Sequence, residues 1–305
     1  MPGAPGLEML SSTNFWMCFA GLIYLAAGVL ILRKDIGAAG GWDKLIALGP
    51  VFIAVSLAAF APEHFRGPEF VRDMVPSYMP ARMFWVYFVG CALLAAATSL
   101  TVRKFVGLSS ALLGLMFFLF VLMLYLPSAI RHPGNRFAWA YALRDLSLCA
   151  GAWALAGQYS RATMPRQSKA MILFARMVFA TAGIFYAVEH FLHPEFAPGV
   201  PLELTTPAWV PFASVWGYLS GAILLVAGAA LALNKRPRIA AASIGAWMTV
   251  LTLSLYMPIL IFARGGPAPE FNDAINYVAD TLLYAGAALA LASALPRNPE
   301  SVEKA

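Results

Sequence analysis

The chain has 305 residues, of which 61% are hydrophobic and only 12% carry a formal charge. Soluble domains have about 25% charged residues, so this composition excludes a soluble domain and indicates an integral membrane protein. The net charge is +6, but the basic residues lie in short segments between apolar runs, without the aromatic-interleaved basic stripe of a nucleic-acid binder. We therefore expect the lipid bilayer, and no nucleic acid, as a partner.

Apolar runs long enough to cross a hydrocarbon core of about 30 Å recur from one end of the chain to the other. The first run follows a segment without Lys or Arg, and its positive residues, Arg33 and Lys34, come after it. That order predicts a retained helix rather than a cleaved leader. In all, we expect an all-α membrane protein with nine transmembrane helices, near residues 14–32, 45–63, 82–102, 105–129, 138–158, 170–191, 212–233, 238–263 and 274–295.

Basic residues are unequally divided between the two sides of these spans. Thirteen Lys and Arg residues of the connecting segments fall on one side and six on the other. Short basic segments stay in the cytoplasm. We therefore expect a multi-pass protein of the bacterial inner membrane, with its N-terminus outside and its C-terminus in the cytoplasm.

One pattern occurs twice in the chain, and it predicts a tandem duplication. The shared tracts are FAPEHF and YAVEHF at 60–65 and 186–191, Pro-x-aromatic-x-Pro at 76–80 and 207–211, and Trp-x-Tyr-x-x-Gly at 85–90 and 216–221. We expect an N-terminal helix and loop, a first four-helix repeat, a cytoplasmic linker, and a second four-helix repeat with its tail, at 1–44, 45–158, 159–169 and 170–305. Four spans per repeat give two parallel bundles, related by a pseudo-two-fold axis along the membrane normal.

The repeated Glu-His pairs end the second and sixth predicted spans, on the outer side. Charged groups are costly near lipid, so a repeated pair indicates a site. Histidine suits proton transfer near neutral pH, and an adjacent glutamate can orient it. The catalytic candidates are therefore Glu63, His64, Glu189 and His190. The structural alternative is a pair of histidines that cap their own helices.

Other repeated polar and aromatic residues also fall in the outer half of the predicted membrane. They are the ligand-binding candidates Trp85, Tyr125, Arg131 and Asp145, with their counterparts Trp216, Tyr256, Arg264 and Asp280. One interpretation is a polar pocket in each bundle, covered by the Pro-x-aromatic-x-Pro loops, that binds an anion, a thiol or a quinone head group. The other is a buried Asp–Arg–Tyr network that fixes helix packing.

The cysteine and histidine content limits the redox chemistry that the chain can perform. Cys18, Cys91 and Cys149 are isolated in apolar spans, which argues against a dithiol relay. The chain has only four histidines, of which His132 and His193 lie outside the repeated pairs, which disfavours a two-haem cytochrome b arrangement. We expect no metal site; haem is disfavoured and quinone is the cofactor candidate.

These motifs resemble those of the DoxX-like family of bacterial membrane proteins. The resemblance lies in the His-Phe that ends a first helix, the Pro-x-aromatic-x-Pro loop, the Trp-x-Tyr-x-x-Gly opening of the next helix, and the tract RMVFATAGIFY at 176–186. It is strongest over 170–295 and weaker over 45–158. It implies a four-helix unit and an association with quinol oxidase and thiosulfate:quinone oxidoreductase complexes, although many members have no assigned activity.

Three hypotheses for function follow. The first is a redox-associated component that handles a quinone or a sulfur compound on the periplasmic side. The second is a non-catalytic accessory or scaffold subunit that packs against partner subunits of a larger membrane complex. The third, a small-molecule transporter, is weakened because the sequence repeats no polar site near the membrane midplane. No motif decides whether the protein is an enzyme.

Overall fold

The computed structural model describes residues 12–297, and within that range the regular structure is helical, which confirms the all-α prediction. In this described part of the chain, one isolated β-bridge joins Phe196 and Thr205. The elements, in chain order, are α2 (Thr13–Ala38), α3 (Trp42–Ala47), α4 (Gly49–Arg66), α5 (Pro68–Met74), α6 (Arg82–Val102), α7 (Val106–Phe120), η1 (Val121–Tyr125), α8 (Leu126–Arg131), α9 (Arg136–Tyr159), α10 (Pro165–Leu192), α11 (Ala213–Ala232), α12 (Pro237–Leu251), η2 (Thr252–Tyr256), α13 (Met257–Ala263) and α14 (Ala268–Ala294).

Eight helical segments of the described chain are long and apolar enough to cross a membrane. They correspond to eight of the nine predicted spans. The remaining one, predicted at 138–158, forms α9, a helix of 24 residues that does not meet the same hydropathy limit. Its Arg144-Asp145 pair lowers the hydropathy, and its packing against α7, α10 and α14 shields it. Eight of the nine predicted spans therefore meet this criterion, whereas α9 carries a charged pair within an otherwise mostly apolar helix, so the ninth span stays a prediction.

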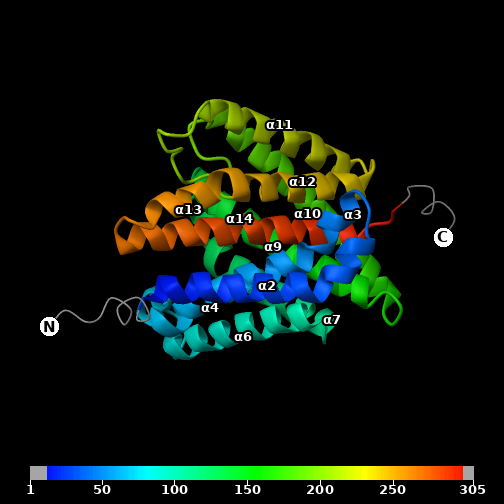
Figure 1. Ribbon diagram of the computed structural model, residues 1–305, viewed down its shortest axis with the longest axis horizontal. Coiled ribbons are helices and arrows are strands. Elements are labelled where there is room, and N and C mark those ends of the chain that lie inside the picture. The colour runs from blue at the N-terminus through cyan, green and yellow to red at the C-terminus, as the bar shows by residue number, and fades with distance from the viewer. Residues whose placement is uncertain (1–11, 298–305) are drawn as a thin grey trace.

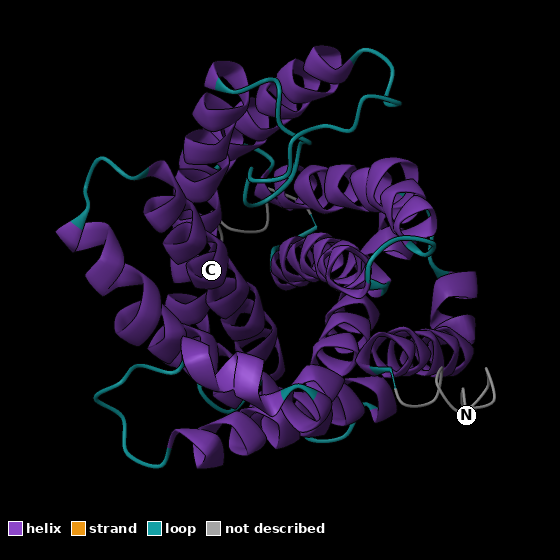
Figure 2. Cartoon of the chain, turned by 90° about the vertical axis from the view of Figure 1, so that its left-hand side faces the viewer, coloured by secondary structure: helices purple, strands orange, loops and turns teal. Residues whose placement is uncertain are grey.

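The long helices lie roughly along one axis of the molecule (Figure 1). We call the two ends of this bundle the Glu63 end, where α2 begins and α4 stops, and the Arg161 end, where α9 and α14 stop. Figure 2 views the helices nearly end-on from the Glu63 end. Helices α9 and α14 pack against each other at the centre, with α4 on α14 and α10 on α9.

The helix contacts follow a matched pattern across the chain. Helix α4 packs on α6 as α10 packs on α11, and α7 packs on α9 as α12 packs on α14. The contacts of α4 with α14 and of α10 with α9, however, join helices of different predicted repeats. The expectation of two separate bundles, each with its own interior, is therefore corrected: the two sets of helices interlock through α9 and α14.

Glycines allow this close approach at the centre. A Cβ added at Gly151 of α9 would collide with Ala287 of α14. A Cβ added at Gly286 of α14 would lie 2.9 Å from the carbonyl oxygen of Gly49 on α4. Small residues let helix backbones approach each other in a membrane, where van der Waals packing drives association.

Two short π-helical segments, η1 and η2, interrupt the helices that begin as α7 and α12. Each ends in a tyrosine, Tyr125 or Tyr256, and a proline follows two residues later, Pro127 or Pro258. A proline ring clashes with the carbonyl of the preceding turn of an α-helix, and a wider turn relieves that clash. The π-helical turns thereby set the direction of the two tyrosine side chains, a role typical of such bulges.

Candidate functional site

Arg144 of α9 makes polar contacts with three other side chains in the middle of the molecule. Its Nε donates a hydrogen bond to Oδ1 of Asp145 at 2.9 Å, and its Nη1 donates to Oδ2 of Asp280 on α14 at 3.2 Å. Its Nη2 donates to the hydroxyl of Tyr125 in η1 at 3.4 Å. One guanidinium therefore joins three elements. We call Arg144, Asp145, Asp280 and Tyr125 the Arg144 cluster.

Three of these four residues, Tyr125, Asp145 and Asp280, lie at repeated positions that predicted two separate sites. The structure instead brings Asp145 and Asp280 onto the same guanidinium, at the contact between α9 and α14. Arg144 was not predicted, because it lies inside a predicted span and the comparison of charges concerned only the connecting segments. The signal that could have found it is the cost of an arginine inside an apolar span, which requires a partner.

The Arg144 cluster has more negative than positive groups. Asp145 is 2% exposed, and the side chain of Asp280 is 21% exposed. Among the described residues, the ion pairs of both carboxylates involve Arg144 alone. A buried ion pair is stable only when its charges are balanced and hydrogen-bonded. One proton, one cation or a positively charged ligand atom would balance the second carboxylate.

Tyrosines connect the cluster to the Glu63 end of the molecule. The ring of Tyr141 stacks on Tyr125, with centroids 5.9 Å apart, and lies 5.2 Å from the guanidinium carbon of Arg144. The Tyr141 hydroxyl donates a hydrogen bond to Glu203. Glu203 belongs to the segment between α10 and α11, so the chain of polar groups runs from the centre to a connecting loop.

That loop, residues 193–212, folds back over the helices. Arg136 at the start of α9 donates to Oε2 of Glu189 at 2.9 Å and to the carbonyl of Leu202 at 3.1 Å. The Tyr256 hydroxyl donates to the carbonyl of Pro198 at 3.2 Å, and Leu202 is buried. The covering part of the loop is therefore 196–205, upstream of the predicted Pro-x-aromatic-x-Pro segment, whose Trp209 is exposed.

The structure does not bring the repeated glutamates and histidines together as dyads. Each histidine Nδ1 donates to the carbonyl four residues earlier in its own helix: His64 to Phe60 at 3.1 Å, and His190 to Tyr186 at 2.6 Å. His190 is fully buried, and its Nε2 has no hydrogen-bond partner among the described residues. The geometry is that of the helix-capping alternative.

The glutamates of these pairs make contacts between helices instead. Glu189 of α10 pairs with Arg136 of α9, as described above. Glu63 of α4 accepts hydrogen bonds from the amides of Asn272 and Asn276 on α14, at 3.0 and 3.1 Å. In both copies of the motif the glutamate side chain contacts the central pair of helices, α9 and α14. The partner of Glu189 is a charged arginine, whereas the partners of Glu63 are neutral asparagines.

The remaining ligand-binding candidates lie away from the Arg144 cluster. Arg131 is exposed and donates to the carbonyl of Pro127 at 3.0 Å, and Arg264 is exposed beyond α13. The Trp85 indole donates to the carbonyl of Pro80 at 3.1 Å, and Trp216 stacks on Trp247. These arginines do not neutralise Asp145 or Asp280, and both tryptophans have local packing roles.

Within residues 12–297, the structure places no three His, Cys, Asp or Glu side chains in a group that could hold a metal ion. Cys18, Cys91 and Cys149 are free thiols on three different helices. The Arg144 cluster and Tyr141 themselves offer carboxylates, one shared guanidinium and tyrosine hydroxyls.

Comparison with known proteins adds a partial family match. A family described as a domain of unknown function (DUF8561) matches residues 53–156, from within α4 to within α9. No curated protein and no solved structure matches the chain. The resemblance to DoxX-like proteins remains a prediction.

Proposed function

We propose that this integral membrane protein is a redox-associated membrane component in which the Arg144 cluster takes up and releases a proton on the outer side. The observation that carries the proposal is the sharing of one guanidinium by Asp145 and Asp280. Two ionised carboxylates with one cation leave a net negative charge in a region of low dielectric, where Coulomb energies are large. A proton on either carboxylate removes that charge.

Tyrosine hydroxyls provide the path for this proton. A hydroxyl donates and accepts hydrogen bonds, so a row of tyrosines can pass a proton between carboxylates. The Tyr141 hydroxyl bonds Glu203 in the covering loop, and the Tyr125 hydroxyl bonds Arg144. The two tyrosines contact each other by ring stacking, so a water molecule would have to carry the proton from one hydroxyl to the other. Glu203 is the group at which protons enter from the Glu63 end, which is the outer side on the charge distribution of the sequence.

The redox part of the proposal has two sources of support. The DoxX-like motifs suggest an association with quinone- or sulfur-linked chemistry. The Arg144 cluster also suits a quinone head group: Arg144 and Tyr125 provide hydrogen-bond donors for a carbonyl oxygen, and the stacked Tyr125 and Tyr141 rings provide an aromatic surface. Quinone reduction consumes protons, and the cluster supplies a group that holds one.

A second function, that of an accessory or scaffold subunit, is favoured by a different observation. The contacts Arg144–Asp280, Arg136–Glu189 and Glu63–Asn272 each join helices of different predicted repeats. Polar contacts between the two predicted repeats fix how their helices align with each other. Fixing this alignment is the best-attested role of buried polar groups. In that case the cluster holds the helices together and exchanges no proton.

Quinone binding separates the two functions. We would extract the protein gently, analyse bound quinone, and measure quenching of tryptophan fluorescence by a quinone analogue in wild type, Asp280→Asn and the exposed control Asp73→Asn. The proposal expects bound quinone and quenching in wild type and Asp73→Asn, and weakened quenching in Asp280→Asn. Protein without quinone or quenching, but with a stoichiometric partner subunit, would favour the scaffold function.

A further inference from the structure

A second polar site lies at the Arg161 end, opposite to Glu203 and outside the proposed proton path. It is a cavity of about 470 Å³ where the ends of α2, α6, α9 and α14 meet the starts of α4, α7 and α12. Small-molecule sites have volumes of about 300–1,000 Å³. The cavity is therefore large enough for a ligand, and on the charge distribution of the sequence it faces the cytoplasm.

The wall of this cavity has an excess of positive charge. Four arginines line it, Arg103, Arg161, Arg238 and Arg297, together with two aspartates, Asp35 and Asp43. Four cations and two anions leave a net charge of +2. A negatively charged ligand would balance this wall.

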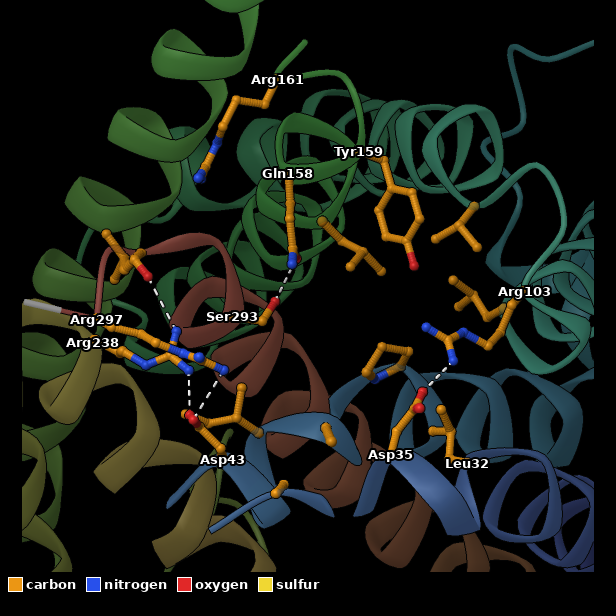
Figure 3. A pocket seen from close by; sticks show the side chains of 18 of the residues that line it. Leu32, Asp35, Asp43, Arg103, Gln158, Tyr159, Arg161, Arg238, Ser293 and Arg297 are labelled. Carbon is orange, nitrogen blue, oxygen red and sulfur yellow. Dashed lines mark hydrogen bonds and ion pairs between the residues drawn. The ribbon is translucent and has the colours of Figure 1, made fainter. Parts of the chain in front are cut away.

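Both aspartates of the wall form ion pairs with arginines, and one of the four arginines, Arg161, forms none among the described residues. Arg103 pairs with Asp35, and both Arg238 and Arg297 pair with Asp43 (Figure 3). Arg161 donates to the carbonyl of Ala294 at 2.6 Å, and among the described residues no ion pair gives it a carboxylate. A guanidinium presents several N–H donors in a planar fork, so Arg161 retains donors for a ligand.

Helix capping explains part of this arrangement but not the cavity. Arg161 and Arg238 donate to carbonyls at the end of α14, as basic side chains commonly do at helix C-termini. Capping needs neither Arg103 nor an open space. In Figure 3, Gln158, Tyr159 and Arg103 surround the open centre of the site together with Ser293. Gln158 accepts a hydrogen bond from Ser293 at 2.7 Å, which leaves its amide N–H groups as further donors.

We propose that this cavity binds a ligand with a phosphate group from the cytoplasmic side. The planar fork of an arginine can donate to two oxygens of a phosphate group at once, and a phosphate monoester carries about −1.5 to −2 charges at neutral pH. That charge balances the +2 of the wall. Apolar residues such as Leu32, Leu100 and Leu155 form the rest of the lining. The apolar lining can contact the acyl chain of an anionic phospholipid, whereas a soluble phosphate compound would contact the arginines alone.

The test uses the full-length protein in phosphatidylcholine nanodiscs, with and without phosphatidic acid, and separately with inorganic phosphate. Native mass spectrometry counts retained lipid, and equilibrium binding of radiolabelled phosphate measures the soluble arm. We compare wild type with Arg161→Gln, and use Arg166→Gln as a control, because Arg166 is an exposed arginine of the same end that does not line the cavity. Loss of a charge-assisted hydrogen bond predicts about tenfold weaker binding in Arg161→Gln only.

A second variant keeps the charges and fills the space. Ala39 lines the cavity at the end of α2 without being buried, so Ala39→Trp obstructs the site at little cost in folding. We expect it to lose the ligand as Arg161→Gln does. Binding of phosphatidic acid alone identifies a lipid site, and binding of inorganic phosphate identifies a soluble phosphate site. Binding of neither, or equal binding in wild type, Arg161→Gln and Ala39→Trp, overturns the proposal.

Discussion

Arg144 of α9 and Asp280 of α14 are 136 positions apart in the chain, and their side chains meet at 3.2 Å between Nη1 and Oδ2. The contact crosses between the two predicted repeats at the centre of the molecule. Asp145 shares the same guanidinium, so the charge of one arginine is divided between carboxylates from both repeats.

We predict that Arg144→Gln destabilises the protein by about 3 kcal/mol, because it leaves two carboxylates without their cation. Thermal unfolding in detergent, followed by tryptophan fluorescence, measures the loss. The control is Arg131→Gln, whose exposed side chain bonds a local carbonyl and whose removal should cost less than about 0.5 kcal/mol. A double-mutant cycle with Asp280→Asn should give a coupling of at least about 1 kcal/mol; additive effects would contradict the ion pair.

The two repeated glutamates should differ in their response to neutralisation. Glu189→Gln leaves Arg136 without its carboxylate, whereas Glu63→Gln retains an amide oxygen that can accept from Asn272 or Asn276. We expect Glu189→Gln to cost about 1–3 kcal/mol more than Glu63→Gln. Melting temperatures of the two variants under identical conditions provide the comparison. Equal losses would show that the charge of the partner does not matter.

Helix packing at the centre depends on the lack of a side chain at Gly151. We predict that Gly151→Ala lowers the stability by about 1–3 kcal/mol, because its Cβ would collide with Ala287. Gly37→Ala in α2 is the matched control: its Cβ would meet no atom within 4 Å, so helix propensity alone should raise stability by about 0.5–1 kcal/mol. Opposite signs are expected, and a loss at both positions would contradict the packing account.

The proposed orientation predicts which loops a membrane-impermeant maleimide can reach. In a chain without its native cysteines, Ser77→Cys lies in an exposed segment at the Glu63 end, and Thr163→Cys lies in an exposed segment at the Arg161 end. We expect spheroplasts to be labelled at position 77 directly and at position 163 only after permeabilisation. The reverse pattern would invert the proposed sides of the Arg144 cluster and of the phosphate cavity.

The sequence predicted the helices well because apolar runs report span length directly. It also found Asp145, Asp280 and Tyr125, because each lies at a repeated position. It did not reveal that both aspartates share Arg144, since the repeat predicts equivalence between two sites and not contact between them. That contact depends on α9 and α14 meeting at the centre, which is a property of tertiary packing.

The cavity at the Arg161 end was missed for a different reason. Arg103, Arg161 and Arg238 were fully accounted for by the rule that basic residues remain in the cytoplasm. The rule concerns the side of the membrane on which a residue lies and says nothing about whether several such residues meet. Only the convergence of helix ends from distant parts of the chain places these arginines around one cavity.

The most direct test of the account is whether a carboxyl group of the Arg144 cluster holds a proton in the folded protein. Infrared difference spectroscopy in nanodiscs detects the C=O stretch of a protonated carboxylic acid and its shift in heavy water. We compare wild type with Asp145→Asn and Asp280→Asn, and use the exposed Asp73→Asn as a control. The account predicts a protonated carboxyl band that persists in Asp73→Asn and is lost in at least one cluster variant. A band unchanged in both cluster variants, or no such band at any pH at which the protein is folded, would contradict it.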